Sequence, residues 1–94
     1  MTKEELGNAI MINVMHVAML LKRKSGMTER QILKSFEQEM VEFQPHTVKA
    51  SLHMGCQLLM FEEKKSFFGL VKRYYWLDRE QFNTRLKERE HERN

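Results

Sequence analysis

Three side chains near the middle of the chain, His46, His53 and Cys56, have the chemistry to bind a metal ion or to act as a nucleophile. His53 and Cys56 are three residues apart and His46 lies seven residues before His53, so a helix places them near one side. A structural zinc site normally has four ligands, and the apolar spacing around Cys56 turns its thiol toward the core. We expect a buried thiol and two exposed histidines, with a zinc site as the alternative.

The sequence carries no other pattern that predicts catalysis. Cys56 is well inside a predicted helix and has no obvious orienting partner. A glycine-rich phosphate loop and a paired-carboxylate constellation are both missing from the sequence. We therefore expect a protein that is not an enzyme and that needs no cofactor, and we interpret the residues around His46 as a binding surface.

The helix that carries this surface is predicted over residues 45–60. Pro45, the only proline, suits a first helical position because its missing N–H has no helical partner there and its φ is already helical. Apolar and small residues then recur every three or four positions and form one buried side. The opposite side, with its two edges, is polar and basic and carries His46, Thr47, Lys49, Ala50, His53 and Gln57.

Residues 60–77 change from a helical period to an alternation of two and predict a β-hairpin. Its second strand is rich in aromatic residues, and Gly69 supplies the permissive backbone of the turn. Two adjacent aromatic residues, Phe67 and Phe68, occupy this turn. Because large apolar side chains are unusual in a solvated turn, they either fold onto the core or contact a partner.

Three further helices are predicted from their capping residues, over residues 2–24, 28–40 and 79–90. The first is apolar nearly all round, so one stripe packs on the core and the second needs another cover. We expect a homodimer built from the first and last helices. Its contact residues are Met11, Met15, Met19, Phe82 and Leu86.

Length and composition predict one cytoplasmic domain spanning residues 1–94, mainly α with a small β-hairpin. The net charge of +3 originates in residues 22–73, which hold ten Lys or Arg against six acidic residues, an excess of four that residues 1–21 reduce by one. A single cysteine excludes an internal disulfide and fits a reducing compartment. The apolar run 9–21 is too short to span a bilayer and lacks the flanks of a signal peptide, so we expect no membrane partner.

The predicted order of elements resembles the winged helix-turn-helix superfamily of small bacterial regulators, of the multiple-antibiotic-resistance and phenolic-acid repressor types. The resemblance covers about residues 5–82 and is carried by Gly26-Met27-Thr28, the segment 52–59 and the segment 72–78. In it, Met27 supplies a very short first strand. The resemblance implies double-stranded DNA binding by a symmetric dimer, with helix 45–60 in the major groove and the hairpin on the neighbouring backbone or minor groove.

Charge and hydrogen-bonding chemistry are compatible with this function. Phosphates dominate affinity for DNA, and six cations surround the predicted groove-entering helix: Arg30, Lys49, Lys64, Lys65, Lys72 and Arg73. His46, Thr47, His53 or Gln57 could read base edges, and Ala50 could contact a thymine methyl. Glu62 and Glu63 place two negative charges on the first strand of the hairpin, which weakens the attraction of these cations for phosphates.

A second hypothesis is a winged-helix adaptor that binds protein instead of DNA. Phe67, Phe68 and the methionine stripe of the first helix are then the contact surfaces. The two hypotheses differ in a direct way: only the first predicts duplex binding that is strong at low salt and falls steeply as salt rises.

Overall fold

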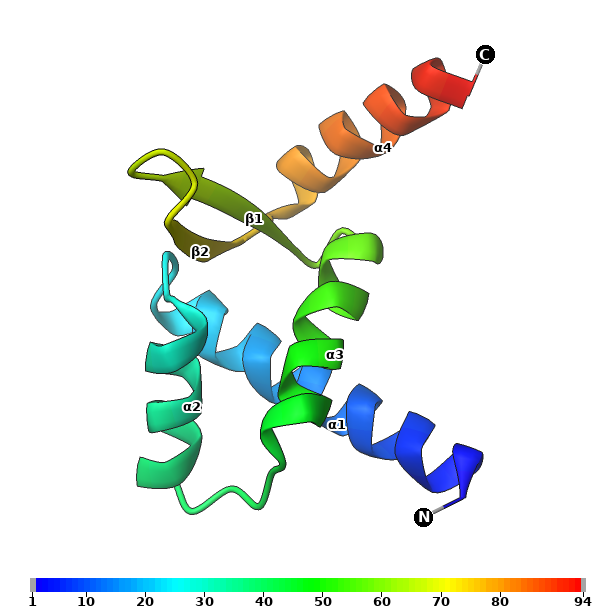
Figure 1. Ribbon diagram of the computed structural model, residues 1–94. Helices are drawn as coiled ribbons and strands as arrows, with labels where there is room; N and C mark the ends of the chain where they lie inside the picture. Colours follow the sequence, from blue (N-terminus) through cyan, green and yellow to red (C-terminus); the bar gives the residue numbers. More distant parts are fainter. Residues whose placement is uncertain (1, 94) are drawn as a thin grey trace.

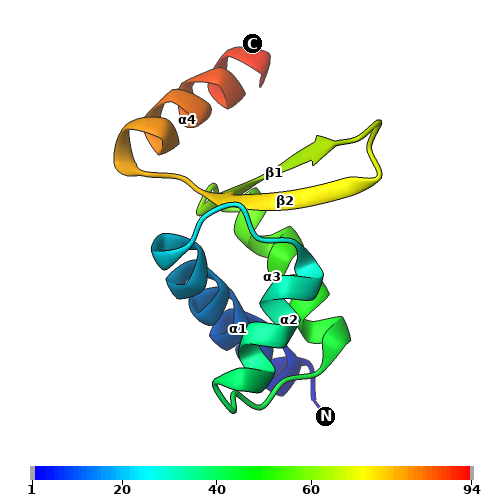
Figure 2. The same cartoon turned by 90° about the vertical axis from the view of Figure 1, so that its left-hand side faces the viewer.

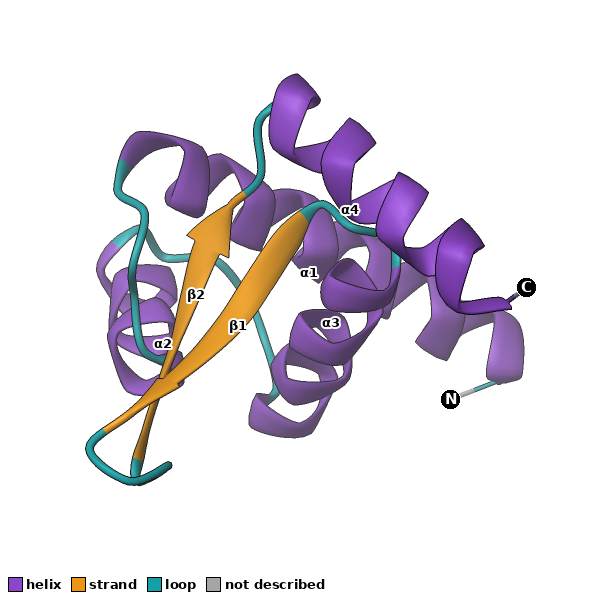
Figure 3. Ribbon diagram, turned by 90° about the horizontal axis from the view of Figure 1, so that it is seen from above, coloured by secondary structure: helices purple, strands orange, loops and turns teal. Residues whose placement is uncertain are grey.

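The computed structural model describes residues 2–93 and contains four helices and a two-stranded antiparallel hairpin (Figure 1). The elements are α1 (Lys3–Arg23), α2 (Glu29–Gln38), α3 (Pro45–Gln57), β1 (Phe61–Ser66), β2 (Val71–Trp76) and α4 (Arg79–Arg93). The first three helices lie on one side of the hairpin, and α4 leaves the end of β2 on the other side, where it lies beside the hairpin and above the end of α3 (Figures 1 and 3). The chain is thus α+β, as the sequence predicts.

Three of the four helices in residues 2–93 begin at capping side chains, and α3 begins at its proline. The Thr28 hydroxyl accepts a bond from the Gln31 amide at 3.2 Å while the Gln31 side chain accepts from the Thr28 amide at 2.9 Å. Asp78 and Gln81 exchange the same pair of bonds at the start of α4. At α3, Gln44 is the N-cap and Pro45 follows at the first helical position.

Two helices end earlier than the periodic pattern predicts. α2 ends at Gln38 instead of residue 40, and α3 ends at Gln57 instead of residue 60. Met40 and Leu59 both adopt a φ of 57°, and the amides that follow them bond back to Phe36 and Gly55 at 2.9 and 3.0 Å. These are Schellman ends, which usually use glycine. Since neither helix has glycine there, the sequence gives no stop signal.

The predicted short strand at Met27 is confirmed as a single-residue bridge to β2. The Tyr74 amide donates to the Met27 carbonyl, and the Gly26 amide donates to the Tyr74 carbonyl, both at 2.8 Å. Gly26 has a φ of 84°, which a residue with a side chain rarely adopts. The connection between α1 and α2 is thereby fixed along the edge of β2 (Figure 2).

The core lies where α1, α2 and α3 meet the base of the hairpin. Its buried residues are Val17, Leu20, Leu21, Met27, Ile32, Phe36, Val48, Leu52, Phe61 and Tyr74. The Phe61 and Tyr74 rings meet edge to face, with centroids 6.4 Å apart. Among residues 2–93, no helix has the length and apolarity that crossing a membrane requires.

A buried polar cluster joins α1 to α3. The Asn13 amide donates to the Thr47 hydroxyl at 2.9 Å, and that hydroxyl donates to the Gln44 carbonyl at 2.8 Å. The Ser51 hydroxyl lies 2.9 Å from the Ile10 carbonyl oxygen. Because these bonds are directional, they fix which side of α3 faces α1 and therefore which side faces solvent.

Candidate nucleic-acid interface

The outward side of α3 carries the polar residues that its periodicity predicts. Because Val48, Leu52 and Gly55 are buried, the opposite side of the helix is exposed. Its exposed members are His46, Lys49, His53 and Gln57, and Ala50 is half-buried beside them. The Gln57 and His53 side chains are hydrogen-bonded at 3.1 Å. The face offers both donors and acceptors to a ligand.

The prediction that Thr47 belongs to this face is wrong. Its side chain is 3% exposed, and its hydroxyl accepts a hydrogen bond from Asn13 and donates one to the Gln44 carbonyl. On α3, Thr47 lies at the border that contacts α1, and a small hydroxyl can turn inward there once it has buried partners. Thr47 positions α3 and does not reach a groove.

The hairpin places four cations on two successive rungs. Lys64 is directly opposite Arg73, and Lys65 is directly opposite Lys72. Like charges in directly opposite positions destabilise a strand pair. The hairpin therefore carries a local excess of positive charge that its own stability does not require.

Two of these four cations have partners within the chain. Lys64 lies 3.9 Å from a Glu62 carboxylate oxygen and 5.1 Å from the centre of the Tyr75 ring. Arg73 donates to the Gly26 carbonyl at 2.9 Å. Lys65 and Lys72 are exposed and form no ion pair with any described residue. They are the cations most available to an anionic ligand.

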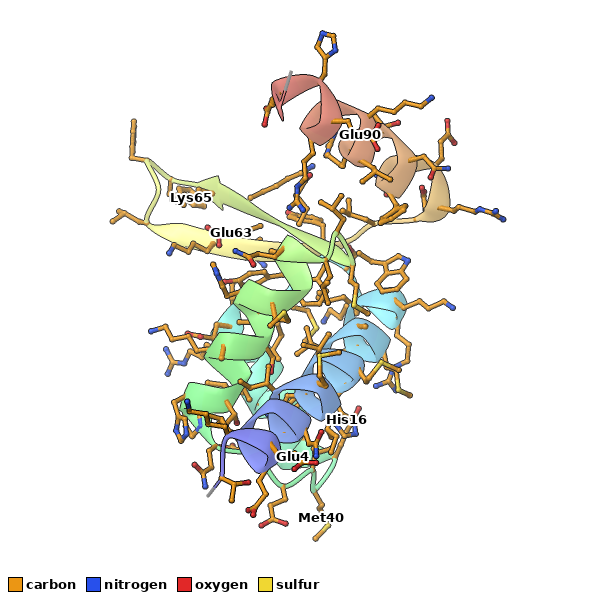
Figure 4. The ribbon with its side chains drawn as sticks, turned by 90° about the vertical axis from the view of Figure 1, so that its right-hand side faces the viewer. Glu4, His16, Met40, Glu63, Lys65 and Glu90 are labelled. Carbon is orange, nitrogen blue, oxygen red and sulfur yellow. The ribbon has the colours of Figure 1, made fainter. Side chains whose placement is uncertain are left out.

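The hairpin projects beyond the helices on the side of α2 and α3, away from α1 (Figures 2 and 4). Lys65 lies on this projecting arm (Figure 4). Arg30 is exposed in the first turn of α2, three residues after the bridge between Met27 and β2. The outward face of α3, the start of α2 and the hairpin lysines thus share one side of the molecule.

The Glu62 carboxylate is paired with an arginine of α4 as well as with Lys64 of the hairpin. Arg85 binds it through Nε at 2.5 Å and Nη2 at 3.4 Å, and this hydrogen-bonded pairing lowers the pKa of the Glu62 carboxyl. Arg89 donates to the carbonyls of Cys56 and Gln57 at the end of α3. These arginines are separated from their partners by 23 to 33 residues, so no local sequence signal predicts the contacts.

Glu62→Gln is expected to lower the free energy of unfolding at neutral pH and to have little effect in acid. The lowered pKa of Glu62 means that its charged form stabilises the fold above the ordinary value of 4.5, and that this contribution is lost as pH falls through the folded-state pKa. Urea unfolding of both proteins at pH 7 and pH 3 measures the difference. Glu63→Gln is the matched control, because Glu63 is exposed and forms no ion pair among the described residues. An equal effect of Glu62→Gln at both pH values would exclude a role for its charge.

The predicted dimer residues lie on two separate surfaces. Met11, Met15 and Met19 are 45%, 57% and 60% exposed on α1, on the side opposite its buried residues. α4, with Phe82 half-buried and Leu86 exposed, does not cover them. The structure therefore leaves the methionines open and does not bring α4 onto them.

Phe67 and Phe68 do not fold onto the core. They are 72% and 107% exposed, and Leu70 beside them is also exposed. Both phenylalanines have positive φ, 51° and 58°, which is strained for aromatic residues. The expectation that the two phenylalanines fold onto the core is therefore wrong, and contact with a partner stays a prediction.

The histidines and the thiol do not converge. Burial and the Glu63 carboxylate raise the pKa of Cys56 to about 11, so the thiol stays protonated at neutral pH. In the described part of the chain, no group of three His, Cys, Asp or Glu residues is placed to hold a metal ion.

No family model, curated protein or solved structure matches the chain. The function is therefore inferred from the arrangement of its own residues. The side of the molecule that combines α3, the start of α2 and the hairpin lysines is the strongest candidate interface. Asn13 and Arg89 donate hydrogen bonds to α3, and Arg85 binds Glu62 of β1. These three residues help to position the interface, and only the tertiary structure identifies them.

Proposed function

We propose that the protein is a winged helix-turn-helix module that binds double-stranded DNA. In this proposal α2 and α3 form the helix-turn-helix, α3 enters the major groove and the hairpin is the wing. The single-residue bridge at Met27 supports the proposal, because it adds a third short strand to the hairpin in the order that such folds use. The proposal concerns the module and does not name a target sequence.

The observation that carries the proposal is that the outward face of α3 and the exposed hairpin lysines lie on one side of the molecule. Lys65 and Lys72 contact phosphates and orient the protein, while exposed α3 side chains reach base edges. Gln57 can bind adenine through its amide once it releases His53, and Ala50 can contact a thymine methyl. The cations at Arg30 and Lys49 extend the phosphate contacts on either side of α3.

Neutralising the two available lysines tests the proposal. We expect Lys65→Gln/Lys72→Gln to weaken binding to a fluorescent mixed-sequence duplex about tenfold and to reduce the slope of log K against log salt by about 2, because two phosphate contacts are lost. Anisotropy titrations at several salt concentrations measure both quantities. The fold should not suffer, because the substitution removes a pair of like charges in opposite positions.

The control is Lys3→Gln/Lys87→Gln, which removes the same charge from exposed positions at the start of α1 and on α4. It is expected to keep most of the affinity and the salt slope of the unmodified protein. Equal losses in the two double variants would mean that only net charge matters, and would contradict a defined interface.

The exposed turn favours a second candidate function, a protein-binding adaptor that uses Phe67, Phe68 and Leu70. Strained backbone at positions with no internal packing is typical of binding sites. The same titrations separate the two functions. A duplex that stays free at the lowest salt concentration would exclude the DNA-binding proposal and leave the adaptor as the function that the surface supports.

A further inference from the structure

The exposed side of α1 has a symmetric pattern of charged and apolar residues. Glu4 and Lys22 are 18 residues apart, which is five helical turns or about 27 Å, so they project from the same side of the helix. Met11 lies seven residues after Glu4, and Met15 lies seven residues before Lys22. All four side chains are exposed. Read from either end, the stripe has a charged residue, a methionine, a methionine and a charged residue at matching intervals.

We propose that a second copy of this chain packs antiparallel on this stripe of α1. The arrangement is self-complementary, because reversing the second helix brings Glu4 opposite its Lys22 and Lys22 opposite its Glu4. The same alignment brings Met11 opposite Met15 of the second copy at the centre of the interface. Ile12 and Met19, 56% and 60% exposed, border this centre and are covered with it.

The charges of this stripe favour a second copy of α1 as the partner, and they favour its antiparallel orientation. A parallel second copy would place Glu4 against Glu4 and Lys22 against Lys22, which is repulsive, whereas the antiparallel copy forms two opposite-charge pairs. The helix dipoles also favour the antiparallel direction. Glu4 and Lys22 form no ion pair among the described residues, while the neighbouring Arg23 is bound to Glu39 at 2.8 Å. The two ends of the stripe are therefore free to pair between copies.

The rest of the fold leaves this stripe open. α1 uses its opposite side for the core and for two bonds with α3, in which the Ile10 carbonyl accepts from Ser51 and the Asn13 amide donates to Thr47. α4 lies beside the hairpin (Figure 3), so this interface differs from the one expected with Phe82 and Leu86. Methionine side chains adapt to irregular surfaces and suit a small helix-to-helix contact. The proposed dimer does not depend on whether the protein binds DNA.

Charge reversal tests the alignment. We expect the unmodified chain to dimerise in sedimentation velocity. Lys22→Glu or Glu4→Lys alone is expected to raise the dimer dissociation constant about tenfold or more, because two attractive pairs become repulsive. Glu4→Lys/Lys22→Glu restores opposite charges and is expected to recover dimerisation to within about threefold. Lys34→Glu, an exposed position on α2, is the control for charge alone.

Circular dichroism establishes that each variant is folded before it is compared. A monomer at 100 μM would overturn the proposal, as would a dimer that Lys22→Glu leaves unchanged. Failure of the double reversal to recover a folded dimer would show that Glu4 and Lys22 are not opposite each other, and would reject the antiparallel alignment.

Discussion

Gly55→Ala is expected to lower the free energy of unfolding by about 3 kcal/mol, because the core has no room for one more methyl group. A Cβ at this position lies 2.0 Å from Cζ of Phe61 and 2.4 and 2.7 Å from the two Cε atoms. Phe61 is fully buried, so its ring cannot swing into solvent to make space. In an exposed helix the same substitution stabilises by about 1 kcal/mol. The sign of the effect therefore reports the close approach of α3 to β1.

Urea unfolding measures this effect, and two further variants identify its cause. Gly7→Ala is the control, because a Cβ at Gly7 of α1 meets no atom within 4 Å, and we expect it to stabilise slightly. Phe61→Leu removes the three ring atoms that clash. In that background Gly55→Ala is expected to cost less than about 1 kcal/mol, which gives a coupling energy of about 2 kcal/mol. If Gly55→Ala behaves like Gly7→Ala, the packing of Phe61 against α3 is wrong.

This close packing explains why the sequence predicts the position of Gly55 but not its role. The spacing of Val48 and Leu52 places Gly55 on the buried side of α3, and the structure confirms this. Which side chain it meets depends on the turn from α3 into β1, where Leu59 adopts a left-handed backbone. A glycine at Leu59 would have marked that turn in the sequence. The helix starts were therefore predictable from side-chain caps and from Pro45, whereas the ends of α2 and α3 were not.

Some features of the candidate interface also follow from sequence periodicity, whereas others depend on contacts between distant residues. Helical periodicity alone predicts that His46, His53 and Gln57 are exposed, because each is opposite the apolar stripe. Alternation alone predicts two strands and brings Lys65 and Lys72 near the same turn. Neither pattern shows that Arg73 donates a hydrogen bond to the Gly26 carbonyl or that Lys64 pairs with Glu62, because these contacts depend on the tertiary structure.

Thr47 marks the boundary between the two kinds of signal. Its place in the helical period is at the edge of the polar face, so the period cannot decide whether it faces solvent or α1. The deciding partner is Asn13, 34 residues earlier, whose buried amide needs an acceptor. A sequence pattern that considers one helix at a time contains no information about this partner.

Thr47→Val is expected to lower the free energy of unfolding by about 2 kcal/mol, because it leaves the buried Asn13 amide without its acceptor. Valine nearly preserves the shape of threonine, so little of the loss comes from packing. Chemical denaturation measures it. Thr47→Ser keeps the hydroxyl and, as the control, should lose less, while Asn13→Leu/Thr47→Val removes both polar partners and should recover part of the loss.

The same variant separates a buried Thr47 from one that contacts DNA. If DNA binding is established for the unmodified protein, Thr47→Val measured well below its unfolding midpoint should bind duplex within about twofold of it, since a buried hydroxyl makes no base contact. A contact to a base edge would instead contribute about 1 to 3 kcal/mol of discrimination. Loss of affinity on that scale with unchanged stability would place Thr47 on the outward face and reverse the assignment of the two sides of α3.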